Sequence, residues 1–329
     1  MRVERVTTLL YNEVVTLFLG GERMLQFEHI AKSYKTKQIL RDINLTIPKG
    51  QFVAIIGESG CGKSVLGMYL LGMLPDYAVK SGEIWYDGKN LETFSKKERR
   101  RIRGRELGLI PQNPGDSLNP VRKVGGQIWE AARLRDSSGE KKETVQKRLE
   151  IFGVQKDTAK RVAGAYPFEL SGGMQQRAVA AMGTASGAKW ILADEPSKGL
   201  DMTLRRQMYD TLRLVRDRKV KGMLIITHDL VLAEKLCDQV AVMYAGQILE
   251  KGPSRKVLKD PAHPYTQGLL DSLPSRGMHP MKGIAPAPHE KLSGCRFAPR
   301  CPYVSDRCLQ SESEEMEVRG RKVRCFQYA

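Results

Sequence analysis

The chain has 329 residues, of which 41% are hydrophobic, and its 54 Lys and Arg residues against 37 Asp and Glu give a formal net charge of +17. This length is sufficient for one large domain with a smaller additional region, and no apolar run approaches the about 18 residues that a membrane-spanning helix needs. The positive charge favours an anionic partner, either a nucleic acid, an acidic ligand or an anionic membrane face. Because no nucleic-acid-recognition motif accompanies the charge, we do not expect direct binding to nucleic acid.

Residues 1–23 differ from the rest of the chain. Their apolar stretch, residues 9–19, is interrupted by Glu13, so it is too short and too charged to cross a bilayer. We expect the main domain to begin at Met24. Our preferred interpretation of residues 1–23 is an N-terminal extension from a misassigned start codon, and the alternative is an interfacial helix.

The next stretch of the chain has the pattern of β-strands. Residues 25–30 and 39–47 alternate apolar and polar side chains, as half-buried strands do. A turn at 48–50 precedes the apolar run 52–56, which has the length and β-branching of a buried strand. Residues 82–89 form a further predicted strand that ends in an Asp-Gly turn.

A glycine-rich loop follows the buried strand and fits the pattern G-x-x-x-x-G-K-[ST] at every fixed position. Its residues are Gly57, Glu58, Ser59, Gly60, Cys61, Gly62, Lys63 and Ser64. The glycines allow backbone N–H groups to surround a phosphate, and the predicted helix after the loop points its positive end at the anion. We therefore expect Lys63 to reach the β- and γ-phosphates of a nucleotide and Ser64 to ligate Mg²⁺.

Strands and helices alternate over the following 160 or so residues, the pattern of a mainly parallel sheet covered on both faces. The predicted elements are a basic helix at 95–105, a strand at 107–112, helices within 127–165 with a break at 137–139, a helix opened by residues 170–177, a strand at 190–195, a helix at 202–219, a strand at 223–229 and a hairpin over 240–250. Beyond residue 252, prolines multiply and periodicity fades, which predicts a loop-rich C-terminal appendage.

Two acids, Asp194 and Glu195, close the predicted strand 190–195. An acid at this place can hold Mg²⁺ through its water shell, and a second acid can polarise the attacking water. Taken alone, the pair is equally well explained as helix-capping acids after a strand. The stretch Leu170-Ser171-Gly172-Gly173-Met174-Gln175-Gln176-Arg177 favours the catalytic interpretation.

With these motifs in place, the chain resembles the ATPase subunits of ATP-binding-cassette (ABC) transporters over roughly residues 24–329. The motifs that carry the resemblance are the phosphate loop 57–64, Gln112, the signature 170–177, the acid pair 194–195, the segment 197–201 and His228. The resemblance implies an α/β P-loop NTPase fold with a parallel-sheet core, an antiparallel β subdomain and a helical subdomain. We expect the ABC ATPase domain at 24–252, with its helical subdomain at about 113–170, and a C-terminal region at 253–329.

The resemblance also implies roles for residues around the phosphate loop. Tyr34 matches the aromatic residue that stacks on adenine, and Gln112 matches the residue that senses Mg²⁺ and the γ-phosphate. Asp194 matches the Mg²⁺-associated acid and Glu195 the general base. His228 matches the switch histidine that contacts the γ-phosphate. Mg-ATP hydrolysis is the implied activity.

Four further residues are implied to act across a pair of subunits. Ser171, Gly172 and Gly173 begin a predicted helix, so their N–H groups can face a phosphate, and in the family that phosphate belongs to ATP held by the opposite subunit. Asp201 matches the family's aspartate, whereas Lys198-Gly199 departs from the usual Ser-Ala or Thr-Ala. We expect function to be kept and the contacts across the pair to differ.

The end of the chain narrows the resemblance. Residues 263–270 and 294–302 are similar to the C-terminal region of bacterial dipeptide, oligopeptide and nickel importer ATPases. This implies a peripheral subunit on the cytoplasmic face of the inner membrane that pairs with a second homologous ABC ATPase, docks on two transmembrane permease subunits and serves an extracytoplasmic substrate-binding protein. Peptide import is the preferred function and nickel or metal-chelate import the alternative. A soluble ABC ATPase of DNA repair or translation fits less well, because such proteins usually carry two cassettes or a coiled-coil insertion.

Four of the six cysteines lie close together at the C-terminal end, at Cys295, Cys301, Cys308 and Cys325. Without a convincing signal peptide, disulfides are not expected, and the gaps of 5, 6 and 16 residues differ from the two close pairs of a zinc ribbon. Some dipeptide-importer ATPases with a similar tail carry a [4Fe-4S] cluster. The resemblance therefore predicts such a cluster here, with a structural role, and reduced structural thiols or zinc are the alternatives.

Overall fold

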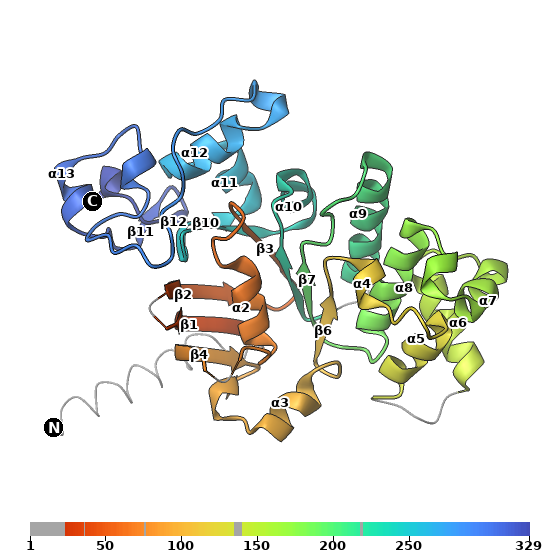
Figure 1. Ribbon diagram of the computed structural model, residues 1–329. Coiled ribbons are helices and arrows are strands. Elements are labelled where there is room, and N and C mark those ends of the chain that lie inside the picture. The colour runs from red at the N-terminus through yellow and green to blue at the C-terminus, as the bar shows by residue number, and fades with distance from the viewer. Residues whose placement is uncertain (1–23, 36, 76, 135–139, 218–219) are drawn as a thin grey trace.

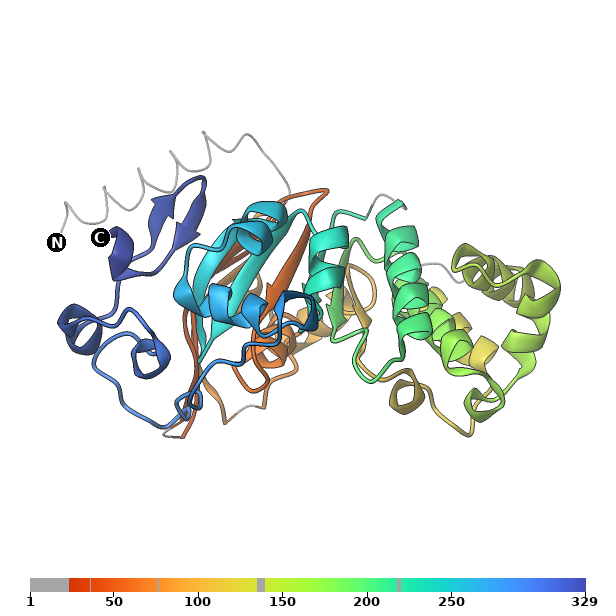
Figure 2. The same ribbon diagram turned by 90° about the horizontal axis from the view of Figure 1, so that it is seen from above.

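The computed structural model describes residues 24–35, 37–75, 77–134, 140–217 and 220–329 (Figure 1). The N-terminal extension predicted at residues 1–23 and the helix break predicted at 137–139 both lie outside the described residues. Within the described part of the chain, the fold consists of two sheets, a helical half and a C-terminal region that joins the larger sheet (Figures 1 and 2).

The smaller sheet is antiparallel and has the strand order β2-β1-β4-β5. The strands are β1 (Leu25–Tyr34), β2 (Lys37–Ile47), β4 (Val79–Tyr86) and β5 (Lys89–Asn90). Leu25 pairs with Ile47 on one side and with Tyr86 on the other. The alternation seen in the sequence buries Leu25 and Phe27, and an irregularity in the strand pairing between Phe27 and Ile30 allows Ile30 to be buried as well. This sheet confirms the predicted antiparallel β subdomain.

The larger sheet has the described strands in the order β11-β12-β10-β9-β3-β8-β7-β6. Its bounds are β3 (Phe52–Ile56), β6 (Leu107–Ile110), β7 (Trp190–Asp194), β8 (Gly222–Ile226), β9 (Gln239–Tyr244), β10 (Gln247–Pro253), β11 (Met316–Val318) and β12 (Arg321–Val323). The strands from β6 through β7, β8 and β3 to β9 are parallel. Their carboxyl ends therefore meet at one edge, where ligands bind in open α/β sheets.

Helices cover the larger sheet and form a separate cluster beside it. The first group in the chain is α2 (Lys63–Leu70), α3 (Lys96–Ile102), α4 (Pro114–Ser117), α5 (Val124–Ala132), α6 (Lys141–Ile151), α7 (Lys156–Gly164) and α8 (Gly172–Thr184). Ser95 and Glu98 form a capping box at the start of α3. In both views α4–α8 lie together at one end of the molecule, where Ile128, Leu149 and Val162 are fully buried.

The remaining helices follow the acid pair. They are α9 (Met202–Asp217), α10 (Leu230–Leu236), α11 (Ser254–Lys259), α12 (Pro264–Asp271) and α13 (Asp306–Gln310). Short 3-10 turns occupy Leu91–Thr93, Pro167–Glu169, Pro274–Arg276, Ala298–Arg300 and Phe326–Tyr328. No helix among the described residues has the length and apolar character needed to cross a membrane.

The C-terminal region is more closely joined to the main domain than its sequence suggests. The predicted boundary at residue 252 falls inside β10, and β12 pairs with that strand through Glu250 and Val323. Val257, Tyr265 and Leu270 are buried in the main hydrophobic core. Strands β11 and β12 could not be predicted, because each has three residues, too few to show a period-2 pattern.

Candidate nucleotide site

The phosphate loop lies between the end of β3 and the start of α2, as its sequence predicts. Gly57 has a φ of +151°, and a Cβ atom there would lie 2.0 Å from the carbonyl oxygen of Met243. Gly62, with a φ of +107°, is the N-cap of α2. A side chain at Gly57 would collide with that carbonyl, and the positive φ at both positions favours glycine, so these two glycines allow the loop conformation.

Lys63 is almost fully buried and spans the loop. Its Nζ donates hydrogen bonds to the carbonyl oxygens of Gly57 at 2.8 Å and Glu58 at 3.0 Å, and it lies 3.8 Å from Oε1 of Glu195. A buried ammonium group needs such partners to offset its lost hydration. The lysine is therefore held in the cradle where it can meet the phosphates.

Ser64 and Asp194 meet directly, although they are 130 residues apart. The Ser64 hydroxyl donates a hydrogen bond of 3.1 Å to Oδ1 of Asp194. Burial, together with the neighbouring Glu195, raises the pKa of Asp194, while the bond from Ser64 opposes that rise. Hydroxyl and carboxylate oxygens are ligands that suit Mg²⁺, so this donor set fits the metal ion expected with ATP.

Glu195 follows β7 in a left-handed backbone conformation, with a φ of +45°. Its N–H donates a hydrogen bond of 2.7 Å to the carbonyl oxygen of Ile226 at the end of the neighbouring strand β8. This bond stabilises the uncommon backbone conformation of Glu195. Its Oε2 lies 2.6 Å from Nδ1 of His228. The sheet edge thus brings Lys63, Asp194, Glu195 and His228 together, as the sequence motifs predict.

Two other residues implied by the resemblance flank this cluster. Tyr34 ends β1 and is half-buried, with the Lys32 Nζ 4.7 Å from the centre of its ring and the Tyr77 ring 6.0 Å away. Gln112 follows β6, a strand that pairs with β7 just before the acid pair. Their suggested parts in nucleotide recognition remain predictions.

The signature residues lie elsewhere. Ser171 is the N-cap of α8, and Gly172 and Gly173 form its first turn. Figure 1 shows α8 in the helical half, beyond β6 and β7, and α2 beside the smaller sheet. Asp201 is exposed and accepts a hydrogen bond of 2.9 Å from the N–H of Leu204 at the start of α9. The ribbon therefore keeps α8, which the signature begins, apart from α2, which the phosphate loop precedes.

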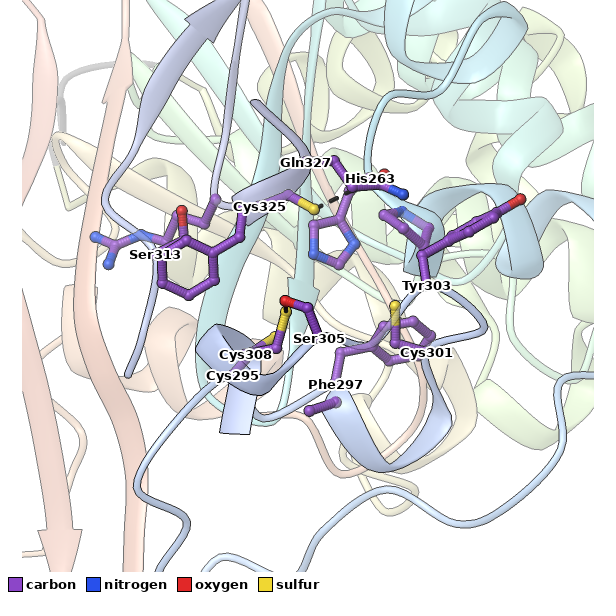
Figure 3. A pocket seen from close by; sticks show the side chains of 14 residues that line it. His263, Cys295, Phe297, Cys301, Tyr303, Ser305, Cys308, Ser313, Cys325 and Gln327 are labelled. Carbon is purple, nitrogen blue, oxygen red and sulfur yellow. Dashed lines mark hydrogen bonds between the residues drawn. The ribbon is translucent and has the colours of Figure 1, made fainter. Parts of the chain in front are cut away.

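The four C-terminal cysteines line one cavity of about 210 Å³, together with His263 and Phe297 among others. Figure 3 shows Cys301, Cys308 and Cys325 directed towards the same space from different segments, with Cys295 beside Cys308. Burial raises the pKa of the Cys295 thiol to about 11. Among the described residues, no three His, Cys, Asp or Glu side chains are close enough to hold a single metal ion, so the predicted metal cluster is not established by this arrangement.

Two residues of the site were not singled out from the sequence. Arg300 contacts the carboxylate of Glu58 at 3.0 and 3.1 Å, and the Tyr265 hydroxyl accepts a hydrogen bond of 3.0 Å from the Glu58 N–H. Both lie in stretches that carry the C-terminal resemblance. No local pattern could pair them with a residue more than 200 positions away, because that pairing depends on the fold.

The chain is similar to ATP-binding proteins of transporters in both of its regions. The family described as "ABC transporter" matches residues 40–198, and "Oligopeptide/dipeptide transporter, C-terminal region" matches residues 249–308. The dipeptide transport ATP-binding protein DppD of Escherichia coli (strain K12) is 37% identical over 294 residues, which cover 86% of this chain and 89% of that protein. The oligopeptide transport ATP-binding protein AppD of Bacillus subtilis (strain 168) is 36% identical over 295 residues, covering 87% and 90%.

Solved structures show the same fold. The cassette cbiO1 from Clostridium perfringens, part of the ABC transporter complex cbiONQ, superposes with a TM-score of 0.63 at 25% identity and covers 73% of this chain and 92% of that one. The ATP-binding cassette MJ0796, solved as a dimer bound to ADP and Pi, gives a TM-score of 0.62 at 24% identity, covering 70% and 99%. These likenesses confirm the predicted P-loop NTPase architecture.

Proposed function

The chain belongs to the ATP-binding subunits of ABC transporters, and from this premise we propose that it couples ATP binding and hydrolysis to the import of di- and oligopeptides through a membrane permease. The observation that carries the proposal is one chain holding both the assembled phosphate-loop site and an oligopeptide/dipeptide transporter C-terminal region. Dipeptide and oligopeptide transport are the activities that the names of DppD and AppD state for those relatives.

The residues around the phosphate loop would have separate roles in binding and hydrolysing ATP. The cradle from Gly57 to Lys63 would hold the phosphates, and Ser64 with Asp194 would hold Mg²⁺, which neutralises phosphate charge when bound. Glu195 would accept the proton of the attacking water, because its carboxylate is nearly buried and is oriented by His228 at 2.6 Å. Tyr34 would stack on adenine, and Gln112 and His228 would respond to the γ-phosphate.

We further propose that two ATPase subunits complete each other's sites. Ser171, Gly172 and Gly173 begin α8 away from the phosphate loop of the same chain, so their N–H groups are available to ATP held by a second, homologous subunit. Asp201, exposed at the start of α9, would lie at the same subunit boundary. ATP binding would close this pair, and hydrolysis would reopen it.

The remaining partners follow from the transporter class. ATP-binding subunits of ABC importers are membrane-associated, and we propose that this one docks on two transmembrane permease subunits at the cytoplasmic face of the inner membrane. An extracytoplasmic binding protein would deliver the peptide without touching this chain. The net charge of +17 suits a position beneath an anionic leaflet.

We also propose that the cysteine cavity holds a [4Fe-4S] cluster with a structural role. Each iron of such a cluster takes one thiolate, so its four ligands surround the cluster and are more widely spaced than the ligands of one metal ion. Cys295, Cys301, Cys308 and Cys325 are arranged around a common space of about 210 Å³, which suits a multi-iron group. Metal binding would add folding free energy to a region built from short elements.

Reconstitution tests the transport function. The chain, its partner ATPase and the permease are placed in liposomes with the binding protein, and uptake of a labelled dipeptide is measured with and without ATP. We expect ATP-dependent uptake that Lys63→Ala abolishes and that Lys147→Ala, a change of an exposed lysine on α6, leaves unchanged. ATP-dependent uptake of nickel or a metal chelate instead of peptide would contradict the proposed cargo.

A further inference from the structure

We infer that Arg300 and Tyr265, two residues of the C-terminal region, position the phosphate loop for ATP by holding Glu58. The inference rests on the proposed function of that loop as the nucleotide site. It makes the C-terminal region part of the ATP site of this chain, in addition to any structural role of its cysteines. Neither residue would touch the nucleotide itself.

The first contact is a two-point ion pair. Nη1 of Arg300 lies 3.0 Å from one carboxylate oxygen of Glu58, and Nη2 lies 3.1 Å from the other. The side chain of Arg300 is 6% exposed and that of Glu58 29%. Paired N–H···O bonds of this kind fix the orientation of both groups and are stronger when water is largely excluded. The carboxylate of Glu58 is therefore held in one direction.

The backbone of Glu58 is held as well. Its N–H donates to the hydroxyl of the fully buried Tyr265 at 3.0 Å, and its carbonyl oxygen accepts from the Lys63 Nζ at 3.0 Å. Side chain, N–H and carbonyl of this one loop residue are thus all bonded, the first two to the C-terminal region. A shift of Arg300 or Tyr265 would move the loop segment on which Lys63 rests.

Contacts other than the one with Glu58 also hold the side chain of Arg300. Its Nε donates to the carbonyl of Lys282 at 3.1 Å, and Nη1 also donates to the Tyr244 hydroxyl at 3.3 Å. The ring of Tyr244 packs against Tyr265, with centroids 4.5 Å apart, and against Phe297 at 5.4 Å. Because these contacts already restrict the rotamers of Arg300, forming the ion pair with Glu58 costs little additional conformational entropy.

The same two segments border the cysteine cavity. Phe297 and Cys301 line that cavity on either side of Arg300 in sequence, and His263 and Pro264 line it immediately before Tyr265. The wall of the cysteine cavity and the contacts of Arg300 and Tyr265 with Glu58, which together we call the clamp, are therefore built from the same two segments of the chain. Arg300 and Tyr265 thus connect these two segments to the phosphate loop.

ATP affinity of the full chain tests the inference. Dissociation constants of Mg-ATP are measured for the wild type, Arg300→Met, Arg300→Lys and Tyr265→Phe, with thermal unfolding recorded for each. Losing a charged hydrogen-bond pair corresponds to about tenfold weaker binding, and we expect this for Arg300→Met. Arg300→Lys should fall between it and wild type, because an ammonium group cannot make both bonds at once. Tyr265→Phe should weaken binding about fivefold, since it removes one hydrogen bond.

A matched control separates positioning from stability. Arg319 lies in the same C-terminal region and pairs with Asp260 at 3.6 Å, with both side chains more than half exposed, so Arg319→Met should leave ATP affinity unchanged. In the assembled transporter, Arg300→Met should raise the KM for ATP while kcat at saturating ATP stays near the wild-type value. The double variant Arg300→Met, Glu58→Gln should bind ATP no more weakly than Arg300→Met alone, because both changes break the same contact.

The outcomes distinguish the two proposals. Wild-type ATP affinity in both Arg300→Met and Tyr265→Phe would overturn the clamp and leave the proposed function standing. Loss of affinity that follows loss of thermal stability equally in all variants, Arg319→Met included, would also overturn it. A wild-type chain with no affinity for Mg-ATP would overturn the proposed function and the clamp together.

Discussion

The phosphate loop and the cysteine cavity both gather residues from distant parts of the chain, but they hold them differently. At the loop, polar groups bond to one another, as Ser64 does to Asp194 and His228 to Glu195. At the cavity, the four thiols are spread around a space whose walls include the buried rings of Phe297 and His263. Polar side chains of the first region therefore bond to one another across the site, whereas the thiols of the second region face a common cavity. Changes at the loop should alter the rate of catalysis, and changes at the cavity should alter stability and metal content.

The largest expected effect comes from Glu195→Gln. If Glu195 is the general base, ATP binding should persist while turnover in the assembled transporter falls about 10²–10⁴-fold. Steady-state hydrolysis and ATP binding are measured side by side. Glu143→Gln, at an exposed glutamate of α6, is the matched control and should hydrolyse ATP normally. Turnover near the wild-type rate in Glu195→Gln would contradict the assignment of Glu195 as the general base.

A second expectation concerns the division between loop and signature. Because α8, which the signature begins, lies apart from α2 of the same chain, the isolated chain should hydrolyse ATP slowly, and adding the partner ATPase with the permease should raise the rate about 10²-fold, the effect of supplying donors to developing charge. ATPase rates are measured before and after assembly, with the oligomeric state followed by light scattering. Full activity in a strictly monomeric preparation would show that one chain suffices.

The cysteine cavity should respond through its metal content. Anaerobically purified chain should be brown and contain about four irons, as four-thiolate ligation of a [4Fe-4S] cluster requires. Cys301→Ser should lose most of this iron and unfold at a lower temperature, whereas Cys237→Ala, at a cysteine outside the cavity, should keep it. Iron analysis and thermal unfolding decide the point. A colourless protein without iron, or one that holds a single zinc, would contradict the proposed [4Fe-4S] cluster.

The smallest effect is a pH dependence from His263, which lies in the wall of the cavity. Burial lowers the pKa of this histidine to about 3, and its Nδ1 accepts a hydrogen bond of 2.9 Å from the Tyr265 N–H. The unfolded chain takes up a proton near pH 6.5 and the folded chain does not, so stability is lost as the pH falls from about 6.5 towards 3.

This loss should amount to about 2 kcal/mol at pH 5, from a linkage of about 1.4 kcal/mol per pH unit. His263→Gln should flatten the dependence of unfolding free energy on pH between 7 and 5, as measured by urea denaturation. His279→Gln, at an exposed histidine, should keep the full dependence. Equal slopes in all three proteins would show that packing of His263 does not govern the cavity's response to acid.

Much of the architecture could be predicted from the sequence because it depends on local patterns. The alternation in residues 25–30, the apolar run 52–56 and the glycine spacing of 57–64 each specify an element without help from distant residues. The resemblance to ABC ATPases also implied that Lys63, Asp194 and His228 act around one nucleotide, and the structure brings them together at the carboxyl edge of the parallel strands. The family and its ATP site were therefore accessible from the sequence.

Only the tertiary structure decided how the C-terminal region joins the rest. Strands β11 and β12 are too short to be recognised, and they exist because β10 offers an edge for pairing. The contact of Arg300 with Glu58 spans 242 positions, and no periodicity or motif links two charges so far apart. The sequence determined which groups can bind a phosphate, whereas the packing of the C-terminal region against Tyr244 of β9 determined which groups hold the loop that binds it.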